Sequence, residues 1–412
     1  MSEWAKSNLL LHFVALILAI LAIIAGIYGL AYAKNAHDEP ILLPIHIKGQ
    51  QDLNLRWRVN FDETEKAELD LMASLKNRNQ LTLFASSELV DEPYCSLNYL
   101  PDSLGFPVLA IGHAHHQCLS ILAELMAGRE YLNDAKVCIV LSPGWFESAG
   151  TNAEAFLEFV RPNFLDRIWL DSKIKKSYKI HLGAFIHKNK NVFTSISPEM
   201  DRFLNLYRMD KQLNSSGAQP IETFEYQLVQ TAKKTFPESF NKIKKIEYDF
   251  ALAPKLMRSD YSNFEKDAIA AKKDVLGRFS NNSIFVDSNY YTTYISDQNG
   301  KHLPGNMDII ELAANDEFED LKMLLTFLKE QKVNCTFVMQ PLNPYHYTNM
   351  EINTEAMEKI IGLVKKTGFP LLNLYVNKKE QYEPAILKDV MHFSDYGWMK
   401  VSQFLQNTYG EE

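Results

Sequence analysis

The sequence predicts an α/β protein in which helices cover both faces of a parallel sheet. Short apolar segments alternate along the chain with longer segments in which apolar residues recur at helical spacing. Strands that alternate with helices form parallel βαβ units, and the connecting helices pack on the sheet. The length of 412 residues fits one large domain or two modest ones, and 46% hydrophobic with 23% charged residues is typical of a folded globular protein.

Apolar segments predict the strands of this sheet. The first one stops on Ala85, Ser86 and Ser87, as expected for a buried strand that ends in a turn. Ligands of open α/β sheets bind where strands end at their carboxyl side, so the two serines are candidates for chemistry. The strand segments are "LTLFA" (81–85), "FPVLAIG" (106–112), "AKVCIVL" (135–141), "CTFVMQPLNP" (335–344) and "FPLLNLY" (369–375).

Helical periodicity marks the segments between and around these strands. We expect the segment after the second strand to be an amphipathic helix that ends at Gly128, and Gly368 to lie just past another helix, because glycine is favoured there. Ser394 is the expected N-cap of the last helix, since its hydroxyl can accept a backbone N–H. The helical segments are residues 62–77, 115–128, 152–160, 315–331, 353–368 and 393–407.

The alternation weakens from about residue 165 to about residue 300. This stretch is rich in Lys, Phe, Tyr and Asn and contains helical pieces near Glu222–Lys234 and Phe264–Leu276. We interpret it as a helical insertion, or cap, on the α/β body.

The amino terminus contains an almost wholly apolar segment, residues 9–33, with no Lys, Arg, Asp or Glu between Lys6 and Lys34. It exceeds the roughly 20 residues that a helix needs to cross a bilayer. A secretory signal has a shorter apolar region of about 7–15 residues, although "AYA" at 31–33 leaves signal-peptidase cleavage as an alternative. We expect a single-pass protein of the cell membrane: a cytoplasmic tail (1–8), a transmembrane anchor (9–33), a stalk (34–60) and an extracytoplasmic domain (61–412).

The charge pattern argues against nucleic-acid binding. The formal net charge is −8, which gives no electrostatic basis for attracting a polyanion. The basic run at Lys173, Lys175, Lys176 and Lys179 is a candidate for binding an anionic polymer, and a solvated face is the more ordinary interpretation.

Cysteine and histidine spacing predicts no metal site. The 4 cysteines, Cys95, Cys118, Cys138 and Cys335, are not paired at metal-ligand spacing, and the last two are expected to be buried thiols in strands. The histidines at positions 113, 115 and 116 fit no common metal site and are expected to be surface or packed imidazoles.

The segment "DVMHFSDYGW" near the carboxyl terminus places Asp389 three residues before His392. A catalytic triad needs a nucleophile, an imidazole base and a carboxylate that fixes the imidazole tautomer. One loop would supply the last two, and Ser87 would supply the hydroxyl. The ordinary interpretations are a chance Asp–His spacing, and a helix capped by Ser86 and Ser87 with Glu88 in its first turn.

An ordered set of motifs resembles the SGNH hydrolase superfamily and, more narrowly, the DltD family of D-alanyl-lipoteichoic acid biosynthesis. Where that family shows "GSSEL" and "SPQWF", this chain has "ASSEL" (85–89) and "SPGWF" (142–146). The departures, Ala85 for Gly and Gly144 for Gln, put the acceptor specificity in question more than the chemistry. The further matches are "IGHAHHQCLSI" (111–121), "PLNPYHY" (341–347) and the terminal "DVMHFSDYGW" (389–398).

The resemblance implies roles for individual residues in an SGNH-type, flavodoxin-like fold. Ser87 would be the nucleophile, His392 the base and Asp389 its orienting carboxylate. The backbone N–H groups of Ser87 and Gly112 would form the oxyanion hole. The expected residues of the substrate pocket are Ser86, Gln117, Trp145 and Asn343.

The function that the resemblance implies is D-alanyl transfer onto a teichoic-acid-type polymer of the cell envelope, with no cofactor. The implied partners are a membrane-bound O-acyltransferase, a D-alanyl carrier, the polymer and the lipid bilayer. Two alternatives stay open from the sequence: an extracytoplasmic esterase or thioesterase, and a non-catalytic, carrier-binding scaffold.

Overall fold

A computed structural model describes residues 71–89, 104, 106, 108–147, 150–160, 162–196, 200, 264–279, 283–309 and 311–410. All of these belong to one compact unit formed by residues 46–208 and 252–412; a second unit, residues 1–45 and 209–251, lies outside them. The predicted tail, anchor and stalk, most of the 62–77 helix, the 222–234 helical piece and Cys95 also lie outside the described residues. No helix in the described part of the chain is long and apolar enough to cross a membrane.

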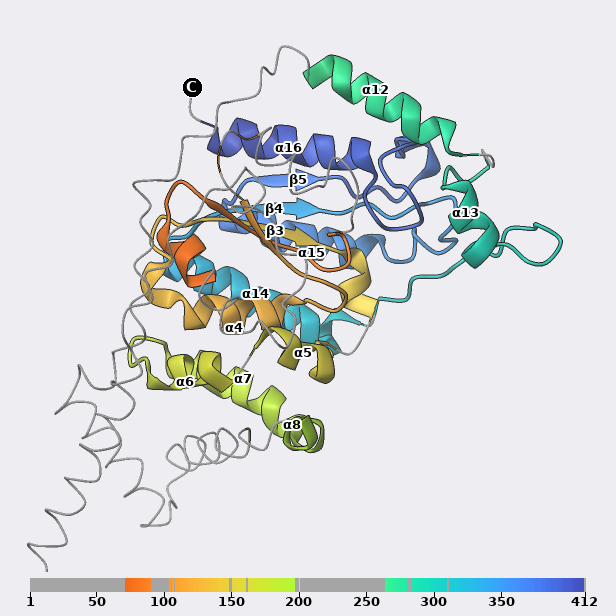
Figure 1. The fold of residues 1–412 in the computed structure, drawn as a ribbon. Helices are drawn as coiled ribbons and strands as arrows, with labels where there is room; N and C mark the ends of the chain where they lie inside the picture. Colours follow the sequence, from red (N-terminus) through yellow and green to blue (C-terminus); the bar gives the residue numbers. More distant parts are fainter. Residues whose placement is uncertain are drawn as a thin grey trace, which may run out of the picture. The chain divides into compact units, whose positions relative to one another are not determined.

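Five described strands form one parallel sheet in the order β2-β1-β3-β4-β5, so the predicted sheet is confirmed (Figure 1). This 2-1-3-4-5 order is that of flavodoxin-like, doubly wound sheets. Each strand falls within its predicted segment, except that β4 begins one residue earlier, at Asn334. The strands are β1 (Leu81–Phe84), β2 (Val108–Ile111), β3 (Lys136–Leu141), β4 (Asn334–Met339) and β5 (Leu371–Asn373).

Helices cover both faces of the sheet, as the alternation predicts. Alternate residues of β3 and β4 point to opposite faces, with Val137 and Phe337 on one face and Cys138 and Val338 on the other. The first face packs against α4 (Cys118–Ala127), α14 (Asp316–Glu330) and α15 (Thr354–Thr367). The second packs against α16 (Asp395–Tyr409), with α12 (Phe264–Gly277) beyond it (Figure 1).

The predicted helix ends are largely confirmed. Gly368 adopts the left-handed conformation after α15, and the Ser394 hydroxyl accepts the Gly397 N–H at the start of α16. Helix α4 ends at Gly128, but it is not amphipathic, because all ten of its residues are buried. The reason is that α4 packs on the sheet beside α14 and is also covered by α6, so no side faces solvent.

The chain between β3 and β4 contains the predicted insertion, and its described parts are mainly helical. Helices α6, α7 and α8 extend the core that α4 begins, on the side away from the sheet (Figure 1). The described helices of this stretch, with the preceding α5, are α5 (Ala153–Phe159), α6 (Pro162–Leu170), α7 (Lys176–Lys188), α8 (Lys190–Ile196) and α12, followed by the short α13 (Ser288–Tyr290).

Candidate active site

The candidate site lies where β1 and β3 end at the carboxyl edge of the sheet. In the strand order, β2 lies on one side of β1 and β3 on the other, so the order reverses at this point. Doubly wound sheets bind ligands where the strand order reverses. After β1, the Leu89 N–H donates to the Ser86 carbonyl at 3.3 Å, which closes a turn with Ser87 and Glu88 at its apex. No described residue between Phe84 and Leu89 is helical. The half-buried Ser87 side chain is therefore presented by a tight turn.

Three of the sequence-predicted residues come together. The Ser87 Oγ lies 3.1 Å from the His392 Nε2, and the His392 Nδ1 lies 2.8 Å from the Asp389 Oδ2. The other carboxylate oxygen of Asp389 accepts the backbone N–H groups of Met391 and His392 at 2.8 and 2.7 Å. These two bonds curl the loop so that the imidazole turns back onto its own carboxylate.

The acid–base balance of the pair suits an imidazole that accepts a proton. Burial alone would raise the pKa of Asp389, but its hydrogen bond to His392 and the charge of that imidazole lower the pKa below the usual value. Burial alone would lower the pKa of His392, but the hydrogen bond and charge of Asp389 raise it above the usual value. The imidazole is thus a stronger base than a free histidine, and Asp389 stays ionised beside it.

Gly112 lies beside this turn in a conformation that only glycine tolerates. Its φ is +156°, and a Cβ built on it would lie 1.9 Å from the Ala85 carbonyl oxygen. Within the described residues, neither the Ser87 nor the Gly112 backbone N–H makes a hydrogen bond. No described residue accepts from either donor, which agrees with the proposed oxyanion hole.

Glu88 belongs to the candidate site, whereas the sequence pattern places it only in the first turn of a helix. Its carboxyl is buried and accepts the Ser86 N–H at 2.7 Å, and the side chain of Ser142, which follows β3, lies near enough to lower its pKa. Burial raises the pKa of Glu88, and the charge of His392 lowers it in part. The signal was the strand-end position of Glu88, next to the candidate nucleophile.

The predicted pocket residues mostly make structural contacts. The Gln117 amide donates to the Trp145 carbonyl at 3.4 Å and accepts the Asn152 N–H at 3.3 Å. Asn343 donates from its side chain to the Ile284 carbonyl at 2.7 Å. Ser86 and Trp145 are both buried beside the turns that follow β1 and β3. The assignment of these four residues to a substrate pocket stays a prediction.

Asn343 also has an indirect connection to the triad. Its backbone N–H donates to the carbonyl of Val390 at 3.0 Å, and Val390 lies between Asp389 and His392. Asn343 therefore holds the loop that carries the carboxylate and the imidazole.

Histidines and cysteines outside the candidate site are also predicted to form no metal centre. In the described ranges no three His, Cys, Asp or Glu side chains are placed to hold a metal ion, and Cys118, Cys138 and Cys335 are free, buried thiols. His116, one of the three clustered histidines, is fully buried and stacked on Phe159.

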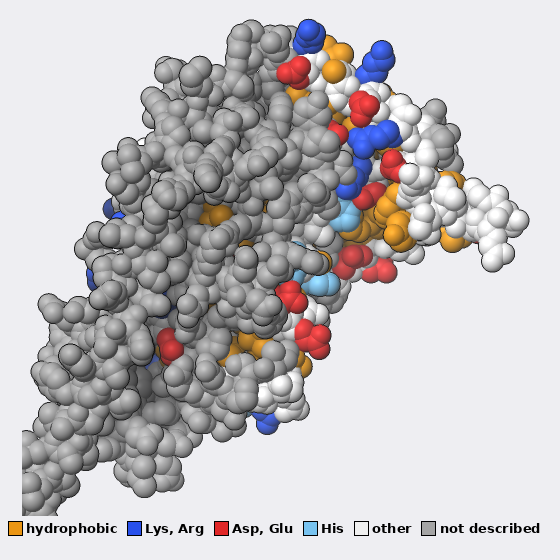
Figure 2. Space-filling model, viewed as in Figure 1, with side chains coloured by type: hydrophobic (Ala, Val, Ile, Leu, Met, Phe, Trp, Pro, Cys, Tyr) orange, Lys and Arg blue, Asp and Glu red, His pale blue; other side chains and the backbone are white. Residues whose placement is uncertain are grey.

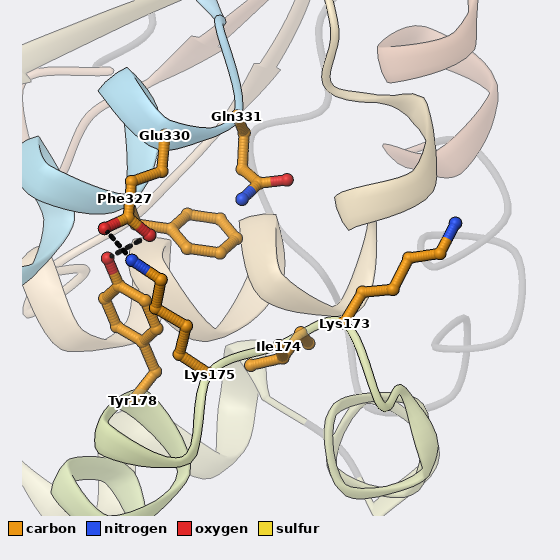
Figure 3. Close-up of a pocket in the computed structure, with 7 residues that line it drawn as sticks. All are labelled: Lys173, Ile174, Lys175, Tyr178, Phe327, Glu330 and Gln331. Carbon is orange, nitrogen blue, oxygen red and sulfur yellow. Dashed lines mark hydrogen bonds and ion pairs between the residues drawn. The ribbon is translucent and has the colours of Figure 1, made fainter.

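The basic run is largely occupied by intramolecular contacts. The Lys175 Nζ pairs with Glu330 at 2.6 Å, and the Lys179 Nζ donates to the carbonyls of Trp169 and Asp171 at the end of α6. Lys173 and Lys175 line a pocket of about 310 Å³ between α7 and α14, in which Tyr178 also bonds to Glu330 (Figure 3). Among the described side chains on the face drawn in Figure 2, basic and acidic groups are interspersed. These contacts favour the ordinary interpretation of this run.

Comparison with known proteins adds an independent finding. The model of a family described as "DltD protein" matches residues 60–409. A Protein DltD from Bacillus subtilis (strain 168) is 22% identical over 350 residues, which are 81% of this chain and 83% of the relative. A Protein DltD from Lacticaseibacillus rhamnosus is 21% identical over 313 residues, covering 72% of this chain and 70% of the relative.

Proposed function

The chain belongs to the DltD family, and from that premise we propose that it transfers D-alanyl groups during D-alanylation of a teichoic-acid-type polymer. The observation that carries the proposal is the 3.1 Å contact between the Ser87 Oγ and the His392 Nε2, with Asp389 on the other ring nitrogen. A hydroxyl aligned in this way is the arrangement of a serine acyl enzyme.

In the first half-reaction, the Ser87 Oγ attacks the carbonyl carbon of a D-alanyl ester or thioester while its proton moves to the His392 Nε2. Asp389 stabilises the imidazolium that forms, and the N–H groups of Ser87 and Gly112 bind the oxyanion. The bond to the leaving oxygen or sulfur then breaks, and that atom takes the proton from His392. The product is a D-alanyl ester of Ser87.

In the second half-reaction, His392 removes a proton from an acceptor hydroxyl as that oxygen attacks the acyl-enzyme. The Ser87 oxygen leaves and regains the proton from the imidazole, so the enzyme returns to its initial state. When the acceptor belongs to a polyol-phosphate polymer, the result is transfer; when the acceptor is water, it is hydrolysis. Each D-alanyl group places an ammonium beside the phosphates and lowers the negative charge of the envelope.

The proposed setting is the outer side of the cell membrane. The apolar segment at residues 9–33 would anchor the chain, and a membrane-bound O-acyltransferase and a D-alanyl carrier would deliver the acyl group. This placement keeps the catalytic domain beside a polymer that is attached to the envelope.

Product analysis tests the proposal. The full-length chain is incubated with a D-alanyl thioester, with and without a polyol-phosphate acceptor, beside the Ser87→Ala variant. We expect D-alanyl ester on the acceptor with the wild type and none above background with the variant. If the wild type released only free D-alanine, even with acceptor in excess, the reaction would be hydrolysis and not transfer. If the variant gave as much product as the wild type, Ser87 would not be catalytic and a scaffold role would be favoured.

A further inference from the structure

One fully buried polar side chain near the candidate site has no hydrogen-bond partner. Gln340 is 0% exposed, and within the part of the chain that the structure describes neither its amide nitrogen nor its amide oxygen is hydrogen-bonded. Buried polar groups are paired in almost all cases, because an unpaired donor or acceptor destabilises the fold. The amide of Gln340 therefore calls for a hydrogen-bond partner that the described residues do not supply.

Gln340 lies at the same edge of the sheet as Ser87. It directly follows β4, and its N–H donates to the Leu141 carbonyl at 2.9 Å, which extends the β3–β4 ladder by one residue. The register then places Gln340 beside Ser142. Both residues come two positions after a side chain of the α16 face, Val338 and Val140 respectively, so they share that face.

The triad loop packs on that same face of the sheet. Phe393, which follows His392 directly, belongs to the core cluster that Val140 and Val338 form with α16. Gln340 and Ser142, which directly follow β4 and β3, therefore lie on the same face of the sheet as the loop that carries His392.

Glu88 completes a row of buried polar side chains across the ends of three strands. Glu88 follows β1, Ser142 follows β3 and Gln340 follows β4, and the Ser142 side chain lies near enough to the Glu88 carboxyl to lower its pKa. Within the described residues Glu88 forms no ion pair with a lysine or arginine. A buried carboxylate without a fixed cation is costly. This row therefore holds a carboxyl group that no described lysine or arginine pairs with, and an amide that no described group hydrogen-bonds.

We propose that Glu88 and Gln340 form a subsite for the ammonium group of an aminoacyl substrate, next to Ser87. An ammonium has three donors, which the Glu88 carboxylate and the Gln340 amide oxygen would accept, and the positive charge would neutralise the carboxylate. The Gln340 amide nitrogen would donate to an oxygen of the same substrate. The inference rests on the proposed function and names the part of the acyl group that the site recognises.

Direct binding tests this subsite without turnover. The full-length chain carrying Ser87→Ala is titrated with D-alanine methyl ester and with methyl propionate, which lacks only the amino group, and binding is followed by ligand-observed NMR. We expect the amino ester to bind about ten- to a hundredfold more tightly, the range of one or two charge-assisted hydrogen bonds. Adding Glu88→Gln or Gln340→Leu should each remove most of this preference.

The variants are chosen so that loss of fold cannot imitate loss of recognition. Glu88→Gln keeps an oxygen for the Ser86 N–H, and Gln340→Leu removes unpaired polar atoms, so neither should lower the melting temperature much. Glu317→Gln is the matched control: Glu317 is another fully buried carboxyl that accepts a backbone N–H, from Cys118 at 2.8 Å on α4. It should leave the preference unchanged.

Equal binding of the two esters, a preference that survives both variants, or no binding of either ester would overturn the inference. Labelling of wild-type Ser87 by a fluorophosphonate, measured in parallel, separates the two proposals. Labelling without an amino-ester preference rejects the subsite alone. A preference without labelling supports the subsite and rejects the serine mechanism.

Discussion

Two histidine–carboxylate pairs meet the end of β1 from different elements. His392 bonds Asp389 at 2.8 Å and contacts the Ser87 hydroxyl through its other nitrogen. His116 bonds Glu124 at 2.7 Å and contacts the backbone carbonyl of Ala85, 3.0 Å away, through its other nitrogen. Both pairs have a short carboxylate contact, so that contact alone does not define a catalytic base.

The difference lies in what the second ring nitrogen contacts. The Ala85 carbonyl can only accept, so the His116 Nδ1 must carry a hydrogen, and this nitrogen cannot take a proton from a nucleophile. Ser87 can donate, and the imidazole of His392 is 22% exposed where that of His116 is fully buried. The second pair thus fixes the strand end to α4, and the first can act on a substrate.

The largest expected effect separates the two imidazoles. His392→Ala should lower the rate of D-alanyl thioester turnover about 10⁴-fold, since loss of one triad member typically costs this much or more. His116→Gln, the matched change in the other pair, should leave the rate per folded molecule within a few fold. Steady-state turnover rates, normalised to folded protein by circular dichroism, measure the effect of both variants. Equal losses in the two variants would contradict the assignment.

The second effect is on stability, and here the large change is expected in the His116–Glu124 pair. Glu124→Leu leaves His116 buried without its carboxylate and should cost roughly 3–5 kcal/mol of unfolding free energy. Urea denaturation followed by tryptophan fluorescence measures it. Glu319→Gln, which breaks a surface pair with Lys322, should cost less than about 1 kcal/mol. A Glu124 variant as stable as the Glu319 variant would show that the buried pair is not a structural link.

The third effect concerns the turn that both pairs contact. Gly112→Ala forces a Cβ against the Ala85 carbonyl, so the proposed oxyanion donor must move, and turnover should fall about 10²–10³-fold. Gly362→Ala is the control: it lies on α15 with no atom within 4 Å of a built Cβ, and it should stabilise the helix by about 0.5–1 kcal/mol without changing turnover. Unchanged turnover in Gly112→Ala would remove Gly112 from the oxyanion hole.

The smallest effect is a shift in pH dependence. Because Asp389 raises the pKa of His392, the rate of Ser87 labelling should fall as the pH decreases through a midpoint above the usual histidine value. Asp389→Asn removes the charge, so its midpoint should move to lower pH while the rate also falls. A pH series of labelling rates, measured below the unfolding range, tests this; an unmoved midpoint in Asp389→Asn would show that another group controls the acid limb.

The elements of the fold followed from local pattern, whereas part of the site did not. Apolar runs ending in small residues identify β1 and its serines, and Asp389 and His392 are close in sequence, so local pattern points to both halves of the proposed triad. Their meeting depends on the order of the strands, which local pattern does not specify. The full burial of α4 was missed because α6, which covers its outer side, lies in the insertion.

Buried side-chain amides show what local sequence pattern cannot predict about the site. Gln117 and Asn343 are predicted pocket residues because of their place in motifs, yet their side chains hydrogen-bond to backbone groups 35 and 59 residues away. Gln340 lies in an apolar strand segment and is not among the predicted pocket residues, yet its amide has no hydrogen-bond partner among the described residues. Which amide is satisfied depends on long-range contacts, and no local sequence signal reports it.

The most direct test of the central claim, that His392 activates Ser87, is intact-protein mass spectrometry after reaction with a fluorophosphonate. Wild type is compared with Ser87→Ala, Ser86→Ala and His392→Ala. The geometry predicts one adduct, mapped to Ser87, that persists in Ser86→Ala and is lost in the Ser87 and His392 variants. An adduct that survives in His392→Ala at the wild-type rate, or none on folded wild-type protein, would contradict it.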